Sequence, residues 1–104
     1  MSKRVQIAAL ADIPPNSMRS FPHGDQRIAI YRIGETIYAT DAICSHEEAD
    51  LAEGWLEADD CAVECPLHGA RFGIKTGKAM SEPADTDVPT YPVKVEGDDI
   101  FVGL

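Results

Sequence analysis

Two short stretches, Cys44-Ser45-His46 and Cys65-Pro66-Leu67-His68-Gly69, share one pattern in this 104-residue chain. They read C-x-H and C-x-x-H, and 18 residues separate the first histidine from the second cysteine. Each stretch offers one thiolate and one imidazole, so two facing loops would supply two sulfurs and two nitrogens. That donor set suits Zn²⁺ or an iron–sulfur cluster. The remaining segments are expected to form the scaffold that holds these loops at one end.

The scaffold has the sequence pattern of an all-β fold. Short runs rich in β-branched and aromatic residues alternate with Gly, Pro and Asp, and no amphipathic helix is apparent. The clearest strand runs from Gln26 to Ile33, with Ile28, Ile30 and Arg32 on one face. Other strands are predicted over 5–8, 18–21, 36–40, 61–64, 70–72, 90–96 and 100–102, and a helical turn is allowed within 47–56. Short antiparallel strands of this kind predict a sandwich or barrel in one domain over residues 1–104.

Composition and charge exclude several functional classes. The chain is 44% hydrophobic and 26% charged, which is typical of a globular protein. Its net charge of −9 disfavours nucleic-acid binding and anionic membrane surfaces. No apolar run approaches the roughly 18 residues of a transmembrane helix, and the N-terminal region lacks a signal-peptide pattern. We therefore expect a soluble cytoplasmic protein, in which three cysteines favour metal binding over disulfides.

The mixed composition of each loop distinguishes the two metal hypotheses. Structural zinc sites usually place two cysteines in one knuckle, whereas a loop with one cysteine and one histidine divides naturally between two irons. Both thiolates then bind one iron and both imidazoles the other, which defines the Rieske [2Fe–2S] centre. The chain resembles the Rieske family in these loops, in the tract 67–72 and in the turn 75–77. A structural zinc-binding domain remains the less favoured reading.

The resemblance covers nearly the whole chain and implies a specific site. It implies a Rieske-like fold with a cluster-binding subdomain, inserted at about residues 42–84. One [2Fe–2S] cluster is expected, with Cys44 and Cys65 on an inner iron. His46 and His68 are expected on an outer iron near the surface. Two neutral imidazoles in place of two thiolates leave the oxidised site neutral, so it accepts an electron more readily than an all-cysteine cluster.

Departures from the respiratory members of the family point to a low reduction potential. Those proteins carry an additional cysteine in each loop, and the pair forms a disulfide. Here the corresponding residues are Ala49 and Leu67. They also carry serine and tyrosine hydroxyls that donate hydrogen bonds to sulfur, where this chain has Ala70 and Phe72. Fewer such bonds stabilise the reduced cluster less, so we expect a potential of roughly −150 mV, at the low end of the Rieske range.

The sequence therefore looks like a Rieske ferredoxin of an aromatic-ring-hydroxylating dioxygenase. Such a carrier takes single electrons from an NAD(P)H-dependent flavin reductase and gives them to a terminal Rieske non-haem iron oxygenase. The chain has no G-x-G-x-x-G motif and no second metal constellation, so it is expected to be a monomeric carrier and not an enzyme. The alternative is a small Rieske-like subunit of another oxidoreductase, such as nitrite reductase.

Other chemically notable residues receive simpler interpretations. His23, in a turn far from the loops, is expected to be solvated. Cys61 is expected to be a buried small thiol, and Trp55 is expected to pack in the core or shield the cluster. Pro83 is either part of a third loop over the cluster or an ordinary turn residue. The acids at 47, 48 and 50 lie beside His46 in sequence, and we expect them to form a docking surface at the electron exit.

Overall fold

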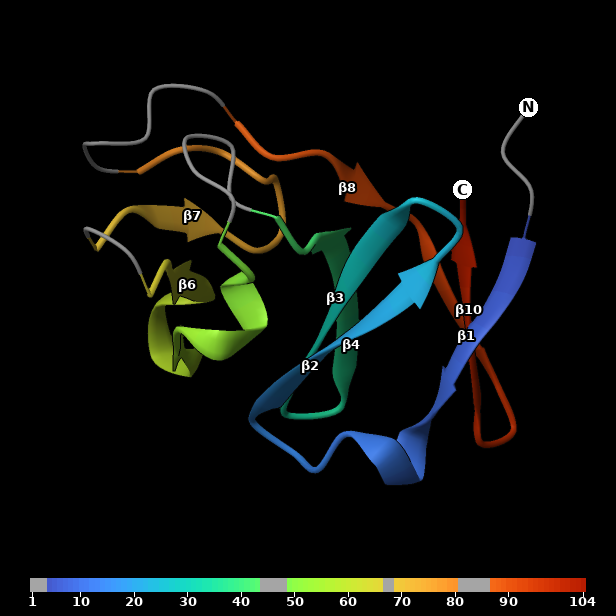
Figure 1. Ribbon diagram of the computed structural model, residues 1–104. Coiled ribbons are helices and arrows are strands. Elements are labelled where there is room, and N and C mark those ends of the chain that lie inside the picture. The colour runs from blue at the N-terminus through green and yellow to red at the C-terminus, as the bar shows by residue number, and fades with distance from the viewer. Residues whose placement is uncertain (1–3, 44–48, 67–68, 81–86) are drawn as a thin grey trace.

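The computed structural model describes residues 4–43, 49–66, 69–80 and 87–104 (Figure 1). These ranges contain ten strands and three single-turn 3-10 helices, and the all-β prediction is confirmed. The strands are β1 (Arg4–Ala9), β2 (Ser17–His23), β3 (Gln26–Ile33), β4 (Thr36–Asp41), β5 (Trp55–Glu57), β6 (Ala62–Glu64), β7 (Arg71–Gly73), β8 (Thr90–Tyr91), β9 (Val93–Glu96) and β10 (Asp99–Gly103). The helices are η1 (Leu10–Asp12), η2 (Leu51–Glu53) and η3 (Ala58–Asp60).

The larger half of the molecule, the base, contains two antiparallel sheets. Their strand orders are β1-β10-β9 and β2-β3-β4-β8. In Figure 1, β1 and β10 cross beside the second sheet, at the end where the chain finishes. The sheets enclose a wholly aliphatic cluster, the base core, whose buried members are Ala8, Ile13, Ile28, Ile30, Ile37, Ala39, Ile100 and Val102.

A smaller three-stranded sheet, β5-β6-β7, lies between β4 and β8 in chain order and beside the base in space (Figure 1). Its strands are only three residues long. It shares a second buried cluster, the loop core, with the adjoining strands and turns. The buried members of the loop core are Ala29, Tyr31, Ala42, Ala49, Leu51, Val63, Cys65, Ala70, Phe72, Ile74 and Val88.

Strand β3 separates the two cores. Ile28 and Ile30 belong to the base core, and Ala29 and Tyr31 belong to the loop core. Alternate side chains of a strand point to opposite faces, so β3 is buried on both sides. The predicted shared face of the even-numbered residues is confirmed, because Arg32 donates to the carbonyl of Ile13, another base-core residue, at 3.1 Å.

Most strand predictions are confirmed, and the exceptions have local causes. The predicted strand over 90–96 is broken at Pro92, which lacks the N–H that a ladder needs. The predicted strand at 61–64 starts one residue later, because Cys61 adopts a left-handed conformation with φ of 50°. β5 is an additional strand that the sequence did not reveal. The allowed helical turn corresponds to η2, and no helix in the described ranges is long and apolar enough to cross a bilayer.

Candidate metal centre

The structure describes one of the four predicted ligands. Cys65 follows β6 directly and is fully buried in the loop core. Cys44, His46 and His68 lie outside the described residues, as does Pro83. The site is therefore defined by the segments that lead into and out of the predicted loops.

The stem of the first loop is closed by backbone pairing. Ile43 and Asp50 form an antiparallel bridge, and the Leu51 N–H donates to the Ala42 carbonyl at 2.7 Å. Ala42 and Ala49 are buried in the loop core on either side of the predicted ligands. The chain thus leaves and re-enters the core at nearly the same place, as a ligand loop requires.

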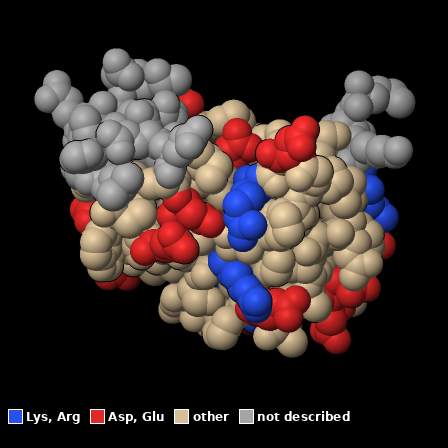
Figure 2. Space-filling model, in the orientation of Figure 1, with Lys and Arg blue, Asp and Glu red and all other residues tan. Residues whose placement is uncertain are grey.

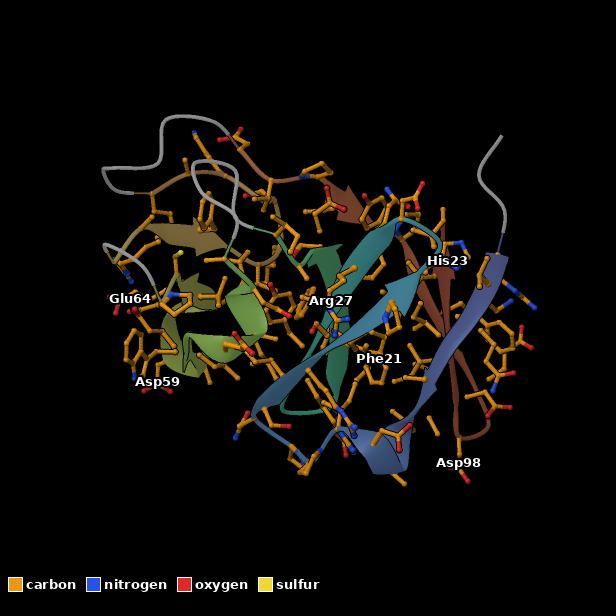
Figure 3. The ribbon with its side chains drawn as sticks, viewed as in Figure 1. Phe21, His23, Arg27, Asp59, Glu64 and Asp98 are labelled. Carbon is orange, nitrogen blue, oxygen red and sulfur yellow. The ribbon has the colours of Figure 1, made fainter. Side chains whose placement is uncertain are left out.

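Asp50 has a structural role instead of the predicted docking role. One carboxylate oxygen accepts the Ala52 N–H at 2.9 Å and caps η2. The other accepts the Ser20 hydroxyl at 2.5 Å and lies 3.4 Å from the Arg27 Nε. Figure 3 shows Arg27 on β3, where the base meets the smaller half. Asp50 therefore joins the first-loop stem to β2 and β3, and the acids at 47 and 48 lie outside the described residues.

The stem of the second loop is equally tight. The Cys65 N–H donates to the Ala70 carbonyl at 2.6 Å, so the two ends of the segment 66–69 are held together. Gly69 supplies the left-handed conformation, with φ of +69°, that this reversal needs. Ala70 and Phe72 follow, fully buried. The positions expected to lack sulfur-directed hydroxyls are therefore apolar and dry.

The residues that flank a third segment, 81–86, also pair with one another beside the loop core. The Val88 N–H donates to the Gly77 carbonyl at 2.8 Å, and the Ala79 N–H donates to the Asp87 carboxylate at 2.8 Å. A Cβ at Gly77 would lie 1.9 Å from the Val88 carbonyl oxygen, so only glycine allows this approach. Val88 completes the loop core, which brings the stems of all three segments together.

An ion pair braces the outer face of the small sheet. The Arg71 guanidinium forms two hydrogen bonds with Glu57, at 3.1 Å and 2.5 Å, across the intervening strand β6. Asp60 lies 3.5 Å away. Hydrogen bonding to Glu57 raises the pKa of Arg71. Because Arg71 immediately follows Ala70, the brace holds the exit of the second loop, a role that spacing alone did not reveal.

The described residues fit a thiolate-ligated cluster. Cys65 presents sulfur, the softer donor, from a buried apolar position at the closed end of a loop. The same buried cluster contains three small side chains of the neighbouring stems, Ala42, Ala49 and Ala70. Cys61, by contrast, lies just before β6 and is half-buried against the loop core, so its predicted burial is only partial. His23 ends β2, on the side of the base away from the small sheet (Figure 3).

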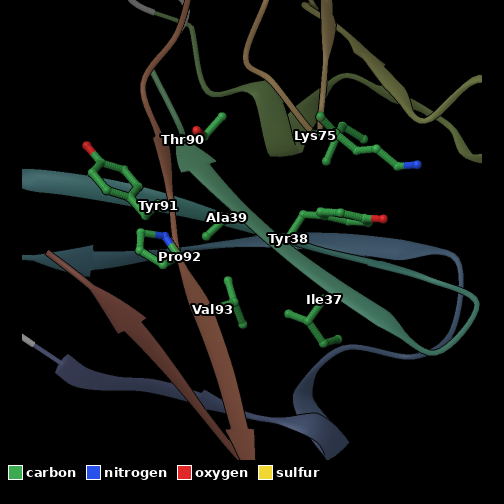
Figure 4. Close-up of a pocket in the computed structure, with 9 residues that line it drawn as sticks. Ile37, Tyr38, Ala39, Lys75, Thr90, Tyr91, Pro92 and Val93 are labelled. Atoms are coloured by element: carbon green, nitrogen blue, oxygen red, sulfur yellow. The ribbon is translucent and has the colours of Figure 1, made fainter.

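A hollow at the border between the two halves offers a different kind of site. It forms where β8 pairs with β4 at only two positions and Pro92 ends the ladder. Figure 4 shows Tyr38 and Lys75 on one side of it, while Tyr91 points away. The lining residues are Ile37, Tyr38, Ala39, Ile74, Lys75, Thr90, Tyr91, Pro92 and Val93. They include none of the Cys, His, Asp or Glu side chains that metal or acid–base chemistry uses most.

Core packing, one of the two roles predicted for Trp55, is wrong, and shielding of the cluster stays a prediction. Instead of packing in the core, Trp55 is 58% exposed at the start of β5, on the edge of the small sheet. The signal that could have placed it is alternation, because Leu56 next to it packs against the loop core. A strand here puts Trp55 and Glu57 on the opposite, outer face.

Known proteins resemble this chain over nearly its full length. A family model described as Rieske [2Fe–2S] domain matches residues 3–92. The 3-phenylpropionate/cinnamic acid dioxygenase ferredoxin subunit of Escherichia coli K12 is 45% identical over 101 residues, covering 97% of this chain and 93% of that protein. The ferredoxin of carbazole 1,9a-dioxygenase from Nocardioides aromaticivorans IC177 superimposes with a TM-score of 0.92 at 34% identity, covering 98% of both chains. A complex of reduced oxygenase and oxidised ferredoxin in carbazole 1,9a-dioxygenase contains a chain that matches with a TM-score of 0.88 at 33% identity, covering 96% of this chain and 92% of that one.

Proposed function

The chain belongs to the Rieske [2Fe–2S] family, and from that premise we propose that it is the ferredoxin of an aromatic-ring dioxygenase system. It carries single electrons to a terminal oxygenase and is not itself the enzyme. The electrons come from an NAD(P)H-dependent flavin reductase. The structural observation that carries the proposal is the convergence of the ligand-loop stems on one buried core that contains Cys65.

The chain binds one Rieske-type [2Fe–2S] cluster. We assign Cys44 and Cys65 to one iron and His46 and His68 to the other. When bound, the cluster supplies one reversible electron. The protein's part is to hold the loops closed and to keep water from the thiolate side, through the stem hydrogen bonds and the dry loop core.

We place the carrier in the cytoplasm as a monomer. Its reductase uses NAD(P)H, and its net charge of −9 favours transient, electrostatically steered encounters with basic partner surfaces. Steered encounters weaken as salt screens the charges. Electron delivery to the oxygenase is therefore expected to slow as ionic strength rises.

A low reduction potential is the quantitative expectation for this site. Ala70 and Phe72 are fully buried and carry no hydroxyl to stabilise the reduced cluster. We predict a midpoint potential of roughly −150 mV. A redox titration followed by visible absorption checks this value, and a clearly positive midpoint contradicts the argument from missing hydroxyls.

Reconstitution tests the function directly. The purified red-brown protein is mixed with NADH and with the reductase and terminal oxygenase of the Escherichia coli 3-phenylpropionate/cinnamic acid dioxygenase. Substrate oxidation should require this protein and should stop when it is omitted. A variant with Cys65→Ser should lose cluster and activity together. A colourless zinc protein without acid-labile sulfide refutes the proposal, and reduction of a nitrite reductase but not of the oxygenase favours the alternative subunit.

A further inference from the structure

We propose that the outer face of the β5-β6-β7 sheet, centred on Trp55, docks an arginine-bearing basic patch of the terminal oxygenase. This inference rests on the proposed function and names the surface that recognises the electron acceptor. The partner contact would lie on the flank of the second ligand loop.

Strand register defines the face. Trp55, Glu64 and Arg71 are directly opposite one another across the three strands, and Glu57 lies two residues along from Trp55 on the same side. The neighbouring row, Leu56, Val63 and Phe72, points the other way and packs in or against the loop core. The face that bears Trp55 is therefore the outer one.

The exposed indole is the first sign of a partner. Of the large apolar side chains that lie exposed in the described part of the chain, Trp55 is the most exposed, at 58%, ahead of Met80, Ile43 and Val95. Tryptophan is enriched among the few residues that dominate binding energy at protein interfaces. An indole held on a strand also loses little conformational freedom when a partner covers it.

Local rigidity supports this reading. A Cβ on Gly54 would lie 1.9 Å from the Glu64 carbonyl oxygen and 3.1 Å from the Pro66 Cδ. The start of β5 is thus pressed directly against the residues on either side of Cys65. Trp55 is presented from backbone fixed to the second ligand loop, so a partner that contacts the indole is positioned relative to that loop.

The charge of the surroundings selects a cationic partner. Residues 49–66 contain six carboxylate side chains and no lysine or arginine. In Figure 2 the described surface over the small sheet shows acidic side chains, whereas the visible Lys and Arg lie over the base. Figure 3 shows Asp59 and Glu64 at the outer margin of this region. Arg71, the cation of the face, is already paired with Glu57.

An arginine fits this combination better than a lysine. Its planar guanidinium stacks on an indole and can pair with a carboxylate at the same time. Glu64 stands one strand away from Trp55, about 5 Å in backbone spacing. Its carboxyl carbon also lies 4.0 Å from the Cβ position of Gly69, in the second loop. We assign the surface to the oxygenase because a ferredoxin of this fold forms a complex with its oxygenase.

Binding measurements with matched variants test the proposal. Dissociation constants of the cluster-loaded protein are measured against the same purified oxygenase and, separately, against the reductase. Trp55→Ser should weaken oxygenase binding about tenfold. Glu64→Gln should weaken it about threefold and reduce its salt dependence. The controls are Val95→Ser and Glu35→Gln, exposed positions on the base, which should change binding less than about twofold.

Visible absorption and midpoint potential are recorded for every variant, so that a disturbed cluster is not mistaken for lost docking. If Trp55→Ser binds the oxygenase as tightly as the wild-type protein, and the wild-type protein still delivers electrons, then the docking surface is refuted and the proposed function stands. Weakened binding to the reductase alone also refutes the docking surface, because the face would then belong to the electron donor. A wild-type protein that delivers no electrons to the oxygenase refutes the proposed function itself.

Discussion

Apart from Ile13, the buried Ala, Ile and Val side chains of the base core lie on strands of five to eight residues, whereas the loop core combines two residues of β3 with three-residue strands and loop stems. Long paired strands specify their register through many repeated contacts. The loop core instead depends on a few close approaches, such as Gly54 against Glu64 and Gly77 against Val88. The base should therefore fold from its hydrophobic pattern alone, while the loop half also depends on its bound cluster.

The largest expected effect comes from removing the bulkiest apolar side chain of the loop core. Phe72→Ala should cost about 3–5 kcal/mol of unfolding free energy and should also release the cluster. Ile100→Ala, equally buried in the base core, should cost about 2–5 kcal/mol and leave the folded fraction with its iron. Urea unfolding with iron and sulfide analysis measures both quantities. Equal loss of iron in the two variants would contradict a division into two cores.

Two glycine substitutions, one in each half of the molecule, test the same comparison with a smaller expected effect. Gly77 and Gly34 both have positive φ, +72° and +59°, so alanine is strained at either position by about 1–2 kcal/mol. A Cβ at Gly77 also collides with the Val88 carbonyl, whereas at Gly34 it meets nothing within 4 Å. Gly77→Ala should therefore destabilise the protein more than Gly34→Ala and alone should lower cluster content. Similar unfolding curves for the two variants would remove the argument from close approach.

The smallest expected effect lies at the border of the two halves. Tyr91 on β8 donates a hydrogen bond to Asp41 at 2.5 Å. Burial and this carboxylate raise the pKa of Tyr91 from its ordinary 10.0 to about 12. The protonated phenol is the form that the fold stabilises, so its contribution is complete below pH 10 and lost as the pH rises through 12. Tyr91→Phe should cost about 1 kcal/mol at pH 8.

That difference should shrink between pH 10 and 12, as followed by urea unfolding across this range. Cluster content should not change, because Tyr91 belongs to the base side of the border. A stability difference that stays constant up to pH 12 would show that the phenol and Asp41 are not coupled.

The sequence predicts the base better than the loop half for physical reasons. Strand β3 is predicted at its observed bounds because alternation, a glycine turn and β-branched residues all agree. β5 is missed because three residues are too few to show a period. The brace between Arg71 and Glu57 is missed for a related reason, since it needs two strands whose pairing the pattern does not specify.

For the site, sequence spacing suggested four ligands but not their supports. The structure places Cys65 in a dry core and shows that the flanking stems are closed, neither of which composition could indicate. At Asp50 the sequence suggested a functional role, whereas the structure shows a supporting one. Its acidic neighbours suggested a docking surface, whereas Ser20 and Arg27, distant in sequence, hold it in place.

Strand β3 has a consequence for how this protein can misfold. Its alternating residues supply both cores, with isoleucines on one face and Ala29 and Tyr31 on the other. A slip of one residue in its pairing would exchange the two sets, forcing the Tyr31 ring into the aliphatic base core and placing isoleucines where the loop core holds Ala29 and Tyr31. A single registration error would thus spoil both halves at once. We therefore expect a misregistered chain to lack both cores, and not to form a folded carrier with an empty metal centre.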